Sequence, residues 1–114
     1  MPKLPLIVEK VWGREYWWVN EDEYCFKTLV LNKGASGSLH YHKKKKETFL
    51  LFAGKVRLEV KDMTIIQGSR FQKTVTILPG TPHRFTGLED SEIFEISTHH
   101  DEDDVVRIEP SRSA

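Results

Sequence analysis

Residues 34–54 read GASGSLHYHKKKKETFLLFAG. Because successive side chains of a β-strand point to opposite faces, His40 and His42 project from the same face of one strand. Glu47 follows the lysine run 43–46, which is long enough for the chain to turn and start a second strand. The segment therefore predicts two strands that bring two imidazoles and one carboxylate to the same side, where they can bind one ion.

The sequence PGTPH, residues 79–83, offers a further ligand. Its two prolines and its glycine fix a tight turn with little conformational freedom, so His83 enters the site from a distant strand. Neutral imidazoles together with one carboxylate suit zinc, iron, manganese, cobalt or nickel without choosing among them. We therefore predict one divalent metal ion with four protein ligands, namely His40, His42, Glu47 and His83.

The rest of the chain alternates between apolar and polar residues. In residues 55–60 three aliphatic side chains alternate with three charged ones, and residues 74–77 and 93–96 alternate in a similar way. Turn residues such as Pro79-Gly80 separate about eight short strands. A chain of this kind closes into an antiparallel β-barrel or jelly roll, whose mouth is a natural concave site. The predicted fold class is all-β.

Length and composition limit the function further. A chain of 114 residues is within the size of a single domain, so we expect one domain over residues 1–114, with a barrel core at about 9–98 and a C-terminal tail at 99–114. No apolar stretch approaches the roughly 20 residues that span a bilayer, and the N-terminus lacks the apolar run of a signal peptide. We expect a cytoplasmic protein without membrane contact. The single cysteine, Cys25, excludes an intramolecular disulfide and is predicted to be buried.

Charge patterning argues against nucleic acid as a partner. The 17 basic residues are balanced by 17 acidic ones, and no second basic cluster accompanies the lysine run 43–46. We interpret this run as a solvated hairpin tip. The acidic run 101–104, next to His99 and His100, is expected to lie in the flexible tail, where a second ion is disfavoured.

One strand has more apolar surface than a single small barrel covers. After Glu47 and Thr48, residues 49–52 are apolar on both faces of the strand. The adjacent Trp17 and Trp18 point in opposite directions if they lie in a strand, which adds to the outer apolar area. Simple packing of sheet on sheet is the alternative, but we favour a homodimer that covers the outer face.

The ligand spacing resembles the two signature motifs of the cupin superfamily. The second motif departs at two positions that carry no ligand, because it has Lys73 where a glycine is usual and Gly87 where an asparagine is usual. The resemblance implies a single cupin-type barrel. The matching residues are Gly34, His40, His42, Glu47 and Gly54 in the first motif, and Pro79-Gly80-Thr81-Pro82-His83 in the second.

Within the superfamily, the chain looks like the type II phosphomannose isomerases, which are also the C-terminal domain of mannose-1-phosphate guanylyltransferase/mannose-6-phosphate isomerase proteins. The similarity runs from Glu9 to about Glu109. Those proteins commonly have glutamine where this chain has His40, and either residue can ligate a metal. The residues that carry the similarity are Trp12-Gly13, Tyr24 with Lys27 and Leu29, residues 38–42, Pro82-His83-Arg84 and residues 103–107.

This resemblance implies a metal-dependent interconversion of mannose 6-phosphate and fructose 6-phosphate. A divalent ion would stabilise the enediolate as a Lewis acid. Lys27 and Arg84 match positions that would bind the substrate phosphate, although a regular strand would point Arg84 away from His83. No general base can be identified, since Glu47 is a predicted ligand. Two alternatives stay open: a non-catalytic metal-containing or sugar-binding cupin, and an iron-dependent dioxygenase.

Overall fold

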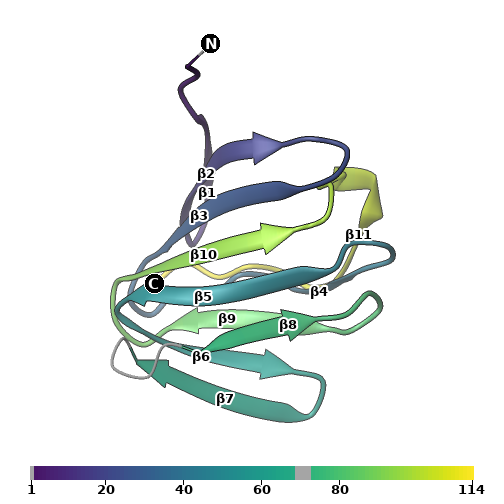
Figure 1. The fold of residues 1–114 in the computed structure, drawn as a ribbon. Helices are drawn as coiled ribbons and strands as arrows, with labels where there is room; N and C mark the ends of the chain where they lie inside the picture. Colours follow the sequence, from purple (N-terminus) through teal and green to yellow (C-terminus); the bar gives the residue numbers. More distant parts are fainter. Residues whose placement is uncertain (1, 69–72) are drawn as a thin grey trace.

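The computed structural model describes residues 2–68 and 73–114, which form eleven strands in two antiparallel sheets packed face to face (Figure 1). The six-stranded sheet has the order β1-β2-β3-β10-β5-β8, and the five-stranded sheet has the order β11-β4-β9-β6-β7. The predicted all-β antiparallel fold is confirmed. The strands are β1 (Leu6–Lys10), β2 (Gly13–Asn20), β3 (Cys25–Leu31), β4 (Leu39–His42), β5 (Glu47–Ala53), β6 (Lys55–Val60), β7 (Met63–Gly68), β8 (Thr74–Ile77), β9 (His83–Gly87), β10 (Ser91–Ser97) and β11 (Val105–Glu109).

The core between the sheets changes character along the strands. In the pairing of β5 with β10, Leu51 lies opposite Ile93 and both are buried, whereas Glu47 lies opposite Ser97 further along. Phe49 lies between these two pairs and contacts Phe85 of the other sheet edge-on, with ring centroids 4.9 Å apart. One end of the sandwich is therefore an apolar core, in which each buried aliphatic side chain contributes about 1.5–3 kcal/mol. The other end is polar and holds the candidate site.

Gly54, between β5 and β6, shows why the first motif requires a glycine. Its φ is +95°, in the left-handed region that glycine tolerates best. A Cβ atom there would lie 2.4 Å from the carbonyl oxygen of Asp90. The close approach lets the β5–β6 turn pack against the start of β10.

The C-terminal segment corrects one expectation. Residues 99–114 do not form a tail, because they contain a 3-10 helix, η1 (Glu102–Asp104), and β11, which pairs with β4 in the five-stranded sheet. Asp101 caps η1 by accepting a hydrogen bond from the Asp103 amide. Asp104 is buried, and its carboxylate accepts hydrogen bonds from the amides of Lys44 and Lys45 at 2.9 and 3.0 Å. The acidic run is thus part of the fold.

The cysteine and the helix content agree with the sequence. Cys25, at the start of β3, is completely buried, as predicted. In the part of the chain that the structure describes, no helix has the length and apolar character needed to cross a membrane.

Candidate functional site

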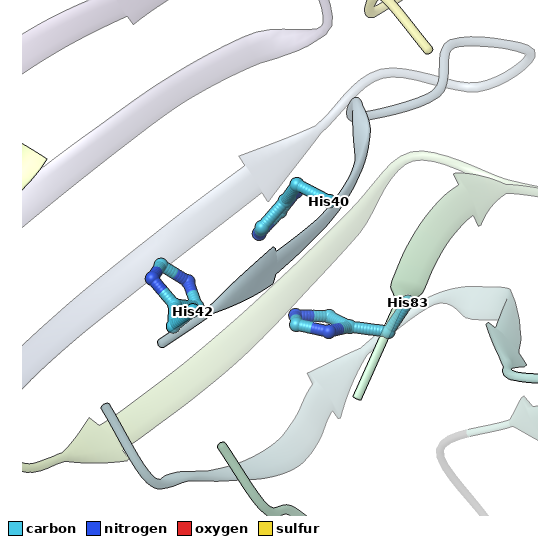
Figure 2. Close-up of side chains that lie close together, drawn as sticks. All are labelled: His40, His42 and His83. Carbon is cyan, nitrogen blue, oxygen red and sulfur yellow. The ribbon is translucent and has the colours of Figure 1, made fainter. Parts of the chain in front are cut away.

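Three of the predicted ligands lie together on the five-stranded sheet. His40 and His42 come from β4, and His83 comes from β9, where it lies directly opposite His40 in the strand pairing. Their ligand atoms all lie within 4.8 Å of one another, and Figure 2 shows the three rings around a shared space. The predicted convergence of the three histidines is confirmed.

The fourth predicted ligand faces them from the other sheet. Glu47, the first residue of β5, is only 2% exposed. Its Oε1 lies 3.1 Å from Nε2 of His42, and its Oε2 lies 3.0 Å from Nε2 of His83. The two oxygens of one carboxylate therefore contact two imidazoles of the opposite sheet, across the interior of the sandwich.

Backbone carbonyl groups fix the orientation of two of the rings. Nδ1 of His40 lies 2.9 Å from the carbonyl oxygen of Ser38, and Nδ1 of His83 lies 2.9 Å from that of Thr81. A carbonyl oxygen only accepts hydrogen bonds, so Nδ1 carries the hydrogen in the neutral ring and Nε2 carries the lone pair. Hydrogen bonds of this kind orient the histidine ligands of metal sites.

The donor set fits a divalent cation. Without a proton between Glu47 and His83, the buried Oε2 of Glu47 has no hydrogen-bond donor, and the buried Nδ1 of His42 has no partner among the described residues, which is a costly state for polar atoms. In the neutral ring, the Nε2 lone pair of His83 faces the Glu47 carboxylate, so two acceptors are held together. A cation between Glu47 Oε2 and His83 Nε2 would satisfy both of these acceptors, and three imidazoles with one carboxylate are ligands that transition metals accept.

A proton competes with a cation for this position. Burial opposes ionisation of the Glu47 carboxyl group. Hydrogen bonds from His42 and His83 outweigh this effect and hold the pKa of Glu47 well below its usual value. Burial also disfavours the charged form of His83, yet the Glu47 carboxylate outweighs it and raises the pKa of His83. For His40, burial and the neighbouring His83 lower the pKa to about 4, so this ring stays neutral.

Lys45 corrects the interpretation of the lysine run as a solvated tip. Its side chain is buried, and its Nζ lies 2.6 Å from Oε2 of Glu95, 2.9 Å from Nδ1 of His100 and 3.3 Å from Oε1 of Glu47. Burial alone would lower the pKa of Lys45, but the two carboxylates outweigh it and raise the pKa. The other three lysines of the run are exposed.

The site opens into a cavity of about 330 Å³, near the lower end of the range for small-molecule sites. Lys27, on β3, lines the cavity and is 2% exposed. Its Nζ lies 4.0 Å from the centre of the Trp17 ring and 3.5 Å from Oε1 of Glu15. Since Glu15 is its one ion-pair partner among the described residues, Lys27 keeps hydrogens that a ligand can use.

Arg84, the other predicted phosphate-binding residue, has different partners. It lies on the cavity wall next to His83, but Nη1 donates to Glu109 at 2.9 Å. Nε donates to the carbonyl oxygen of Gly37 at 3.0 Å, and Nη2 donates to that of Pro110 at 3.2 Å. The Arg84 guanidinium thus binds the residue pair at the end of β11 and the backbone just before β4.

Sequence reasoning missed three buried polar residues of the site. Glu95 had a signal, because alternation places it on the same face as Ile93. Lys45 and His100 had none. Nothing in a run of four lysines distinguishes the one that is buried, and His100 reaches Lys45 from the segment that was expected to be a tail.

Similarity to known proteins is found among solved structures, and it concerns the fold. No protein-family description and no curated protein sequence matches the chain. Among solved structures, the capsular polysaccharide assembling protein CapF of Staphylococcus aureus is 20% identical with a TM-score of 0.77, and the match covers 95% of this chain and 33% of that one. A variant of Bacillus subtilis oxalate decarboxylase OxdC is 19% identical with a TM-score of 0.77, covering 91% of this chain and 30% of that one.

A third structure is similar over nearly its whole length. A variant of Streptomyces PAC13 with uridine is 11% identical with a TM-score of 0.81, and the match covers 96% of this chain and 91% of that one. The chain spans about a third of the CapF and OxdC chains. At these identities the similarity establishes the architecture, and these neighbours are cupin-fold proteins. The chain has the cupin fold.

Proposed function

We propose that this protein is a metal-dependent sugar-phosphate isomerase that interconverts an aldose and a ketose, with mannose 6-phosphate and fructose 6-phosphate as the first pair to test. The observation that carries the proposal is the convergence of His40, His42, His83 and Glu47 beside a cavity that also contains a buried lysine. A bound divalent ion supplies Lewis acidity, which stabilises the negative charge of an enediolate.

The residues of this chain have separate tasks in the proposed reaction. The three histidines and Glu47 would hold the ion, and the apolar core closes one end of the site to water. We assign the substrate phosphate to Lys27 rather than Arg84, because donors of Arg84 already bind Gly37 and the C-terminal residues Glu109 and Pro110. Lys27 is on β3 and Glu47 is on β5, and β10 lies between these two strands. The two strands are therefore about two strand spacings, or roughly 10 Å, apart, with the phosphate end of the proposed substrate at β3 and the metal end at β5.

Two of the similar structures support a sugar-containing ligand. CapF is described as assembling a capsular polysaccharide, and PAC13 was solved with uridine, a nucleoside that contains ribose. OxdC acts as an oxalate decarboxylase on the same fold, so the fold alone does not select the reaction. The isomerase proposal therefore depends on the buried cation Lys27 in addition to the metal ligands.

The decisive experiment uses purified protein reconstituted separately with zinc, iron, manganese, cobalt and nickel. We expect at least one metal to support interconversion of a sugar phosphate, and we expect chelation to abolish it. In heavy water, deuterium should enter the carbon next to the carbonyl group, because a proton is removed there and returned. Lys27→Met should raise KM for the phosphorylated sugar, whereas Lys44→Met, at an exposed lysine, should not.

Other results would select the alternatives. Thermal stabilisation by the same sugars without turnover by any metal form would support a sugar-binding protein. Oxygen consumption by the iron form with an organic substrate would support a dioxygenase.

A further inference from the structure

One carboxylate faces the cavity and is not among the four candidate metal ligands. Glu95 lies in the middle of β10, lines the cavity and is 4% exposed. In the strand pairing it is opposite Lys27 on one side and Phe49 on the other. Glu95 therefore lies between the proposed phosphate-binding lysine and the strand that carries Glu47.

Two neighbours hold this carboxylate by a single oxygen atom. Lys45 Nζ lies 2.6 Å from Oε2 of Glu95, and the hydroxyl of Ser97 donates to the same oxygen at 3.2 Å. The Lys45 ammonium also contacts Glu47, at 3.3 Å, so one cation orients both carboxylates. These contacts leave Oε1 of Glu95 for a ligand in the cavity.

The other carboxylates near the site have different partners. Both oxygens of Glu47 face imidazoles. Asp104 accepts the amides of Lys44 and Lys45 with its two oxygens. Glu15 is on β2, one strand further from β5 than Lys27, and its Oε1 accepts the indole N–H of Trp17 at 2.7 Å. Among the described carboxylates, Glu95 is therefore best placed to exchange a proton with a substrate beside the histidines.

We propose that Glu95 is the catalytic base of the isomerase, an inference that rests on the proposed function. Oε1 of Glu95 takes the proton from C2 of the aldose, the C–H electron pair forms the C1–C2 double bond, and the carbonyl pair moves onto O1. The proton of the C2 hydroxyl then passes to O1, and Glu95 returns its proton to C1 to give the ketose. Atoms and electrons balance without any oxidant or reductant.

The test compares two glutamates of the same strand. Glu95→Gln keeps the size of the side chain and its hydrogen-bonding oxygen but removes the base, so we expect kcat to fall by about 100-fold or more, the usual contribution of acid–base catalysis. KM and metal content should stay near those of the wild type, and deuterium exchange at the substrate carbon should fall in parallel with kcat. Glu92→Gln, on the exposed face of β10, should leave all of these unchanged.

A second variant covers the case in which Glu95→Gln does not fold. Glu95→Asp keeps the charge next to Lys45 but draws the carboxylate back by one methylene, so it should fold with metal bound and still lose at least tenfold in kcat. Wild-type kcat and wild-type exchange in either folded variant would overturn the assignment of Glu95. If the wild-type protein with every metal turns over no sugar phosphate, the proposed function itself fails, and the role of Glu95 fails with it.

Discussion

Each face of the six-stranded sheet carries some residues that are unusual for its position. On the inner face, Glu47 and Glu95 are 2% and 4% exposed, although carboxylates are seldom buried. On the outer face of the same sheet, Trp18, Phe52 and Ile96 are 47%, 50% and 57% exposed. Charges inside and large apolar groups outside both deviate from what stability alone favours. The proposed function accounts for the charges on the inner face through a cation and a substrate, and we propose that a second copy of the chain covers the apolar groups on the outer face.

The inner face tolerates its charges because they are paired. The Lys45 ammonium lies between Glu47 and Glu95, and the histidines surround Glu47 from the other sheet. A buried charge without its partner costs several kcal/mol, so the pairs depend strongly on one another. Among the described residues, the exposed apolar side chains of the outer face belong to no buried ion pair. Substitutions on the two faces should therefore have different consequences.

The largest effect is expected at the metal ligands. His42→Ala removes one imidazole of the converging set, so metal affinity should fall by at least about 100-fold, beyond the loss seen when only an outer partner is removed. Metal analysis after dialysis measures this directly. Tyr41→Phe changes the neighbouring residue, which faces away from the site, and should retain metal. Unchanged metal content in the His42→Ala protein would contradict the assigned site.

Next in size is the loss of the ammonium group between the carboxylates. Lys45→Met keeps a flexible apolar chain but leaves Glu95 and Glu47 without their shared cation, so the free energy of unfolding should fall by about 3–5 kcal/mol. Denaturant unfolding followed by fluorescence gives this value. Lys44→Met, one residue away and exposed, should change it by less than about 0.5 kcal/mol. Equal effects of the two substitutions would show that the burial of Lys45 is not energetically important.

On the outer face, we propose that two copies pack through the region around Trp18, Leu50, Phe52 and Ile96. Phe52→Lys places a charge in that contact and should weaken dimerisation by about 2 kcal/mol or roughly 30-fold in Kd, the effect of a hot-spot residue. Light scattering over a range of concentrations measures the mass. Ile66→Lys changes an exposed apolar residue of β7, in the other sheet, and should not alter it. A wild-type mass of 13.3 kDa at high concentration would exclude the dimer.

The smallest effect is a dependence of metal affinity on pH. The raised pKa of His83 means that a proton shared with Glu47 must leave before a cation binds. Affinity should be nearly constant above that raised pKa and should fall by up to about tenfold per pH unit below it. Competition with a chelating indicator at several pH values tests the sign. An affinity that does not weaken on acidification would mean that protons and metal do not share the site.

Local periodicity was enough to predict the part of the site that lies on regular strands. His40, His42 and Glu47 follow from alternation within β4 and β5, which are consecutive in the sequence but lie in different sheets. Alternation also places Glu95 on the face that carries Ile93, but alternation does not distinguish a position in the apolar core from one in a cavity, so Glu95 was missed. The burial of Lys45 depends on Asp104, which binds the backbone of the lysine run from about 60 residues away, and no local pattern encodes that contact.

The position of β10 also determines when the six-stranded sheet can form during synthesis of the chain. This strand lies between β3 and β5 in the six-stranded sheet, although it follows both by many residues. As the chain emerges from the ribosome, β3 and β5 therefore expose unpaired edges until Ser97 has been made, and such edges favour aggregation. Sheets that depend on distant pairings fold slowly, on the scale of milliseconds to seconds. Assembly of the histidine site should be a late folding event, and chaperones that shield β5 should raise the yield of active protein.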